Sequence, residues 1–231
     1  KLFYDRERYT VSFNVDGGSA VADRIYKFGE AFELPVTTKQ GYAVEGWYRS
    51  SSFDAASKVN AGDLAGTSFE DGTLYVKWAP VPVDFKVEHY KQEIDGTYPS
   101  VPAHSATYQE YTDTVVAAAD YKTDFAGFTF DSTSPSVTVL PDGSAVLVIK
   151  YTRNSYNVTY NFGEAGGANT VTLKYEENVD LTYVPSVTVP NKYFAGWYTD
   201  STCTTEVTSL ATPIGGTTIY AKWADNPSYT V

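Results

Sequence analysis

The sequence predicts an α+β protein that is mainly β, made of small tandem modules with mostly antiparallel sheets and a short helix in each. Three observations support this fold class. Short segments alternate between apolar and polar residues, which is the period of a half-buried strand. Asp-Gly and Gly-Gly pairs separate these segments as turns. A long stretch of sequence also occurs twice, which indicates repeated modules.

The internal repeat organises the whole chain. Residues 3–14, FYDRERYTVSFN, return as residues 150–161, KYTRNSYNVTYN. The tripeptide GWY at 46–48 returns at 196–198, and LYVKW at 74–78 returns as IYAKW at 219–223. We therefore expect five segments, namely 1–8 as the end of a preceding middle-type module, 9–79 as the first repeat, 80–153 as a middle module, 154–224 as the second repeat and 225–231 as the start of a following module.

Strands dominate the expected secondary structure. Each repeat opens with an alternating strand that begins at Tyr9 or Tyr156, and each closes with a second one, at 73–78 or 217–223. The middle module is expected to hold further strands at 83–87, 137–139 and 145–151. Helices are expected in two places, within 57–66 of the first repeat and within 114–121 of the middle module.

The four tryptophans occupy matching positions in the two repeats: Trp47 and Trp78 in the first, Trp197 and Trp223 in the second. A module of roughly 70 residues buries only a modest core, so large aromatic side chains are needed inside it. We therefore interpret the tryptophans as core anchors. The alternative is that tryptophans and tyrosines form an exposed platform on which sugar rings stack.

Residues that could carry catalysis or bind metal are scarce. The chain has two histidines, His89 and His104, one cysteine, Cys203, and no hydrolase or metalloenzyme motif. We expect His89 to be a strand residue with a satisfied hydrogen bond, and we assign Cys203 no role. The sequence therefore predicts a protein that is not an enzyme, with no catalytic residue, no metal site and no cofactor, and it identifies no ligand-binding residue.

The charge and hydropathy of the chain limit its partners. Its formal net charge is −11, so its average surface repels a phosphate backbone and we expect no nucleic-acid partner. No apolar run is long enough to cross a bilayer, so we expect no membrane insertion by this segment.

Several motifs, spaced alike in both copies, carry a family resemblance. They are VSFN at 11–14 with Gly17-Gly18, Gly41-Tyr42, the two GWY tripeptides, and the closing LYVKW and IYAKW. With these motifs the two copies resemble the Listeria–Bacteroides (internalin B-type) repeat. This resemblance implies a β-grasp, ubiquitin-like fold in each module and an extracellular place at the bacterial cell surface, either attached to the wall or secreted.

The middle module is similar to mucin-binding-protein (MucBP-like) modules of bacterial surface proteins. The matching residues are VEHY at 87–90, DGTY at 95–98, GFTF at 127–130 and VIKY at 148–151. The resemblance implies mucin or host glycoprotein glycans as partners, beside the neighbouring repeats of the same chain.

Three functions are compatible with this organisation. The first is a non-catalytic stalk or spacer that projects a distal domain from the cell surface. The second is an adhesin in which the middle module, or its junctions with the repeats, binds mucin or another host glycoprotein. The third is an accessory domain that directs a catalytic region elsewhere in the protein toward carbohydrate.

Overall fold

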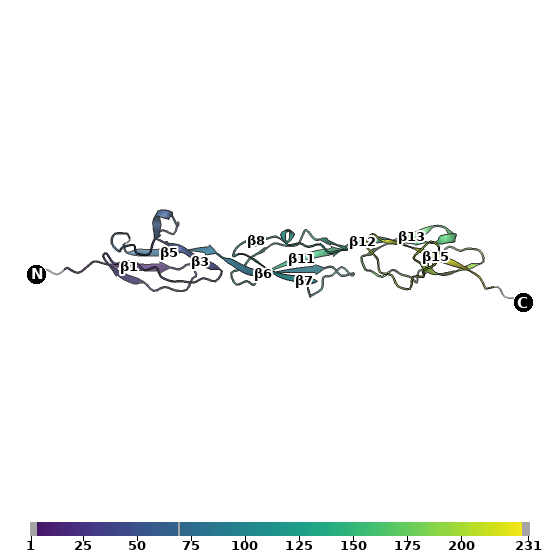
Figure 1. The fold of residues 1–231 in the computed structure, drawn as a ribbon, viewed down its shortest axis with the longest axis horizontal. Helices are drawn as coiled ribbons and strands as arrows, with labels where there is room; N and C mark the ends of the chain where they lie inside the picture. The colour runs from purple at the N-terminus through teal and green to yellow at the C-terminus, as the bar shows by residue number, and fades with distance from the viewer. Residues whose placement is uncertain (1–3, 69, 228–231) are drawn as a thin grey trace. The chain divides into compact units, whose positions relative to one another are not determined.

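The computed structural model describes residues 4–68 and 70–227 (Figure 1). Parts of the predicted segments 1–8 and 225–231, and Phe69 of the first repeat, therefore lie outside the described residues. The chain forms two compact units. One unit contains the chain up to Val87 together with residues 106–117 and 136–147. The other contains residues 88–105, 118–135 and the chain from Val148 onward.

The first repeat folds as a five-stranded sheet. Its strands are β1 (Arg8–Asn14), β2 (Arg24–Lys27), β3 (Tyr42–Tyr48), β4 (Lys58–Val59) and β5 (Gly72–Pro80), in the spatial order β2-β1-β5-β3-β4. The first and last strands, β1 and β5, pair in parallel at the centre, and the other neighbours are antiparallel. The expected opening and closing strands of the repeat are thus confirmed.

The second repeat has the same topology without the short fourth strand. Its strands are β12 (Ser155–Asn161), β13 (Ala168–Lys174), β14 (Lys192–Tyr198) and β15 (Thr217–Asp225), in the order β13-β12-β15-β14. Again the first and last strands pair in parallel. A bulge interrupts the register just before Gly46 in one copy and just before Gly196 in the other, so the two copies share their backbone irregularities as well as their sequence motifs.

The middle segment contributes strands to both compact units. Its larger sheet contains β6 (Pro82–Lys91), β7 (His104–Tyr111), β9 (Phe128–Phe130) and β11 (Val146–Arg153), in the order β7-β6-β11-β9. A separate two-stranded ladder pairs β8 (Val115–Val116) with β10 (Val137–Thr138). The strands expected at 83–87, 137–139 and 145–151 are therefore present, with shifted ends.

The expectation of an α+β, β-grasp fold with a short helix in each module is wrong. No α-helix occurs among the described residues, whose helical turns are the three 3-10 segments η1 (Ala55–Ser57), η2 (Ala118–Asp120) and η3 (Gly163–Ala165). The helix expected within 57–66 is instead a 3-10 end, strand β4 and turns, and the one within 114–121 is β8 followed by η2. The structure is nearly all β.

The two expected helices do not form because these segments contain β-branched and turn-forming residues. Val115 and Val116 favour extended backbone, and they find strand partners in Thr138 and Val137. In the first repeat, Val59 is buried opposite Trp47, and the sequence then turns through residues 60–63, NAGD. An apolar period over so few residues does not distinguish a short helix from a short strand followed by a turn.

Tryptophans anchor the core of both repeats, as expected from the sequence. Trp47 and Trp197 are 1% and 2% exposed, Trp223 is buried, and Trp78 is half-buried against the core of the first repeat. Their indole nitrogens donate to backbone carbonyls of their own repeat, for example from Trp47 to Pro35 at 3.2 Å. These rings therefore fill the modules and do not form a surface platform.

The core role of the tryptophans predicts a large stability loss on truncation. The substitution Trp197→Ala should lower the free energy of unfolding by about 3 to 5 kcal/mol, because it leaves a cavity that the surrounding residues fill only partly. The half-exposed Tyr193 on the same strand provides the control, since Tyr193→Ala should cost less than about 1 kcal/mol. Urea unfolding curves of both variants measure the difference, and equal losses would contradict the core assignment.

Candidate functional site

His89 lies on β6 as a buried strand residue, which confirms the expectation for this position. Its side chain is 2% exposed, and its Nδ1 lies 2.9 Å from the hydroxyl of Tyr151. That hydroxyl also accepts the backbone N–H of Thr123 at 2.9 Å. Burial, and then the neighbouring His104 with its ring centre 5.5 Å away, hold the pKa of His89 below its ordinary value. A buried and neutral imidazole of this kind supports the fold.

Two aspartates lie in the turns that their Asp-Gly pairs predict. Asp95 and Asp142 each accept the backbone N–H and the hydroxyl of the residue two positions later, Thr97 or Ser144, which is the turn role expected for them. Hydrogen bonds from Thr97 and Ser144 hold the pKa of both carboxyl groups below their usual range. Within residues 4–68 and 70–227, no three His, Cys, Asp or Glu side chains gather in a way that could hold a metal ion.

The described part of the chain has no helix with the length and apolar character needed to cross a membrane.

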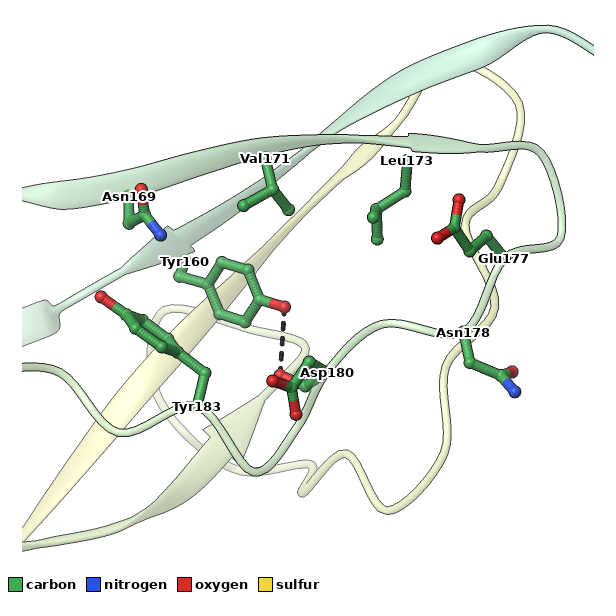
Figure 2. Close-up of a pocket in the computed structure, with 8 residues that line it drawn as sticks. All are labelled: Tyr160, Asn169, Val171, Leu173, Glu177, Asn178, Asp180 and Tyr183. Atoms are coloured by element: carbon green, nitrogen blue, oxygen red, sulfur yellow. Dashed lines mark hydrogen bonds between the residues drawn. The ribbon is translucent and has the colours of Figure 1, made fainter. Parts of the chain in front are cut away.

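A small cleft lies in the second repeat, between β13 and the loop that follows it (Figure 2). Its volume is about 270 Å³. Val171 and Leu173 project from β13 toward Tyr160, and Tyr183 lies across from them on the loop (Figure 2). The hydroxyl of Tyr160 donates to the backbone carbonyl of Asp180 at 3.0 Å, which ties the loop to the strand.

Two residues in this part of the second repeat are smaller than their counterparts in the first repeat. By strand register, Leu173 stands where the first repeat has Tyr26, and by the backbone hydrogen bonds of the following loop Val179 stands where it has Phe32. Tyr183 compensates in part by packing against Tyr160, with ring centres 5.0 Å apart. The first repeat also has a cleft at the equivalent place, with a volume of about 430 Å³, so its larger rings do not fill the hollow. That cleft is lined by Arg24, Ile25, Tyr26, Glu30, Ala31 and Glu33.

The two carboxylates at the cleft are already engaged within the chain. Asp180 accepts the backbone N–H and the hydroxyl of Thr182, which lower the pKa of its carboxyl group. Glu177 accepts the backbone N–H of Lys174 at 2.8 Å. Since binding pockets for small molecules usually enclose some 300 to 1,000 Å³, this cleft suits at most a small ligand held by apolar contact.

The junction between the first repeat and the middle segment consists of one residue, Val81, between β5 and β6. The N–H of Val81 donates to the carbonyl of Gly41 at 3.1 Å, and the carbonyl of Val81 accepts the N–H of Thr112 at 3.1 Å. Thr112 is 2% exposed, and its hydroxyl also donates to Gly41 at 2.8 Å. Beside it, the hydroxyl of Tyr42 donates to the carboxylate of Asp113 at 2.6 Å, and this bond raises the pKa of Tyr42. Backbone and side-chain bonds thus fill this junction.

The junction between the middle segment and the second repeat also consists of one residue, Asn154, between β11 and β12. Arg153 lies beside it with its side chain 9% exposed. The guanidinium donates to the backbone carbonyls of Gln92 and Tyr175, each at 2.9 Å, and forms an ion pair of 2.8 Å with Glu176. One arginine therefore binds groups from the middle segment and from the second repeat together.

Aromatic and lysine contacts complete this second junction. The ring of Tyr175 meets the edge of Phe128 at 6.0 Å, and Gly127 leaves room for that ring, because a Cβ at this position would overlap it. Lys174 donates from its Nζ to the backbone carbonyl of Ile94 at 2.7 Å. These contacts are not predicted by the sequence patterns. The signal that could have revealed them is the return of Arg6 as Arg153 within the repeated segment.

The buried state of His89 predicts a pH dependence of stability. Because its pKa is lowered in the folded chain, the unfolded chain takes up the proton first, and stability is lost as the pH falls below about 6.5. Urea unfolding at pH 7 and pH 5 should show this loss, and His89→Gln should reduce it. Most of the carboxyl groups with lowered pKa titrate below this window. A variant that keeps the full loss would show that another group causes it.

Comparison with known proteins relates the chain to one family of repeats. A family model described as the Listeria-Bacteroides repeat domain matches residues 9–77 and again 156–222, which together make up more than half of the chain. A protein of Evansella cellulosilytica, provisionally named a Gly-rich membrane protein, is 28% identical over 242 residues, covering 96% of this chain and 25% of that protein. A second protein of the same organism, provisionally named a membrane protein, is 26% identical over 234 residues, covering 94% of this chain and 32% of that protein.

The chain thus spans about a quarter to a third of the length of these relatives. The matched segments coincide with the two copies recognised from their shared motifs, and each contains the parallel pair of first and last strands. The chain belongs to the Listeria-Bacteroides repeat domain family, of which it carries two copies.

Proposed function

We propose that the chain is a non-catalytic stalk segment of a bacterial cell-surface protein, in which folded modules hold a distal domain away from the cell. The observation that carries this proposal is the construction of the two junctions. At each one a single residue connects the last strand of one module with the first strand of the next. A stalk needs such short connections because flexible linkers would let the distal domain fall back.

The residues at the junctions support this role. Pro80 and Pro82 flank Val81, and proline fixes φ and restricts the residue before it, so the first connection has little freedom. The second connection is held by Arg153, whose bonds satisfy carbonyl groups that would otherwise be desolvated without partners. Both sets of contacts are of the kind found inside domains.

The proposed location at the cell surface is based on the relatives of the chain. Both relatives are provisionally named membrane proteins, and this supports a place at the bacterial cell surface, outside the cell. The assignment of the middle segment as a MucBP-like module, and of the repeats as internalin B-type, stays a part of this proposal.

The adhesin function is the alternative, and the cleft beside Tyr183 is the observation that favours it. Its size and its engaged carboxylates fit an extended glycan poorly. Sugar-binding surfaces also present exposed aromatic rings. In the middle segment Tyr108 and Tyr111 are 40% and 55% exposed, but they stand three positions apart on β7 and so point to opposite faces of the sheet. The stacked ring pairs His89–Tyr151 and Tyr183–Trp197 each contain a buried ring. The described aromatic contacts therefore favour the stalk.

Display on cells tests the stalk function directly. The chain is placed between a wall anchor and an epitope tag, and the height of the tag above the membrane is measured by fluorescence. The tag should stand higher than with a Gly-Ser linker of equal residue number, because the ends of a flexible coil separate only with about the square root of its length. Equal heights would contradict a stalk. Saturable binding of the displayed chain to immobilised mucin, absent with the linker, would favour the adhesin.

A further inference from the structure

Three residues of the first repeat hold the positions of the three junction residues of the second. Lys27 of the first repeat corresponds to Lys174 of the second. Lys27 pairs with Arg8 on the first strand of its repeat, and Lys174 pairs with Ser155, which is the residue that matches Arg8. The next residue in each repeat, Phe28 or Tyr175, donates its N–H at 2.8 Å to the residue that precedes the first strand, Glu7 or Asn154. The residue before that one is Arg6 in the first repeat and Arg153 in the second.

In the second repeat these positions are occupied by contacts. Lys174 and Arg153 donate to the carbonyls of Ile94 and Gln92, in the turn region that follows β6. Tyr175 packs against Phe128 and over Gly127. The surface that receives them therefore offers outward backbone carbonyls and a glycine beside an aromatic ring.

In the first repeat the same positions face solvent. Phe28 is 46% exposed, and Arg6 and Lys27 are exposed, whereas Arg153, Lys174 and Tyr175 are half-buried. Tyr4 shows a larger contrast, because it is 85% exposed while its counterpart in the repeated segment, Tyr151, is 1% exposed on β11. The ring of Phe28 also lies over Gly66 of its own repeat, where a Cβ would overlap it. Tyr4 and Phe28 are therefore the more exposed counterparts of two aromatic side chains that are buried or half-buried at the second junction.

A cleft of about 280 Å³ joins Tyr4, Arg6 and Lys27 into one surface, and Phe28 follows Lys27 directly in the chain. The cleft is lined by Tyr4, Asp5, Arg6, Arg8 and Lys27. Three of the five are cationic, in a chain with a net charge of −11. Backbone carbonyls, which are the acceptors used at the matching place in the second repeat, suit such donors.

We propose that a further module of the middle type docks on the surface formed by Tyr4, Arg6, Lys27 and Phe28. In this docked state the side chain of Tyr4 is buried in the added module, as that of Tyr151 is buried in the middle segment. The partner would present a turn with free carbonyls and a Gly-aromatic pair, like Gln92, Ile94 and Gly127-Phe128. One contact is lost, since Gly29 stands where the second repeat has Glu176. The proposal deepens the stalk function, because it names the neighbour that extends the array.

Hydroxyl-radical footprinting of an extended chain tests this docking. A copy of residues 80–150 is joined directly before Tyr4, in place of residues 1–3, and side-chain oxidation is compared with the original chain by mass spectrometry. Oxidation of Tyr4 and Phe28 should fall at least several-fold, toward the rates of Tyr151 and Tyr175. Oxidation of the half-exposed Tyr193 should stay unchanged, since no new contact reaches it.

A linked control separates docking from simple lengthening. It carries residues 80–153 followed by a Gly-Ser linker before Tyr4, so the added module is complete without Tyr4, and Tyr4 should remain as reactive as in the original chain. Unchanged oxidation of Tyr4 and Phe28 in the direct fusion would overturn the proposal. An added module that fails to fold in the direct fusion, while it folds in the linked control, would overturn it as well. Neither outcome depends on the height of a displayed tag, so the stalk function is tested separately.

Discussion

A single residue stands between the last strand of one module and the first strand of the next, and the rest of the structure depends on this constraint. One extended residue spans only about 3.3 Å, so modules joined in this way cannot stay apart. Their ends must touch, and the polar backbone groups at those ends lose access to water. Each must then find a partner inside the protein, because a buried and unpaired group costs about 1 to 3 kcal/mol.

The two junctions meet this requirement by different means. At Val81 the backbone supplies most of the bonds, with the hydroxyl of buried Thr112 as a further donor to Gly41. At Asn154 the guanidinium of Arg153 supplies the bonds. It donates to one carbonyl of the middle segment and one of the second repeat, and it forms an ion pair with Glu176. The positive charge is tolerated at 9% exposure because carbonyl oxygens and a carboxylate surround it. An apolar side chain of similar length would leave these acceptors without a donor.

The features predicted from the sequence are those that short-range patterns encode. Alternation placed the first and last strands of both repeats, and the matching tryptophans identified their cores. The predicted helices were wrong because Val115, Val116 and Val59 pair with strands that are distant in the sequence. A local apolar period carries no information about such pairing. The cleft beside Tyr183 lies between β13 and the loop that follows it, and the path of that loop is known only from the fold. Arg153 was visible as a repeated residue, but its burial between two segments follows only from the fold.

Distance measurement by pulsed electron resonance across the second junction tests the central claim most directly. Spin labels at Ser100 and Thr188, both exposed and both in the second compact unit, are introduced with Cys203→Ser to remove the native thiol. The account predicts one narrow distance distribution, which Arg153→Met broadens. Arg49→Met, at an exposed arginine of the first repeat, should leave it narrow. A broad distribution in the unaltered chain, or one that Arg153→Met leaves unchanged, would contradict a junction held by this arginine.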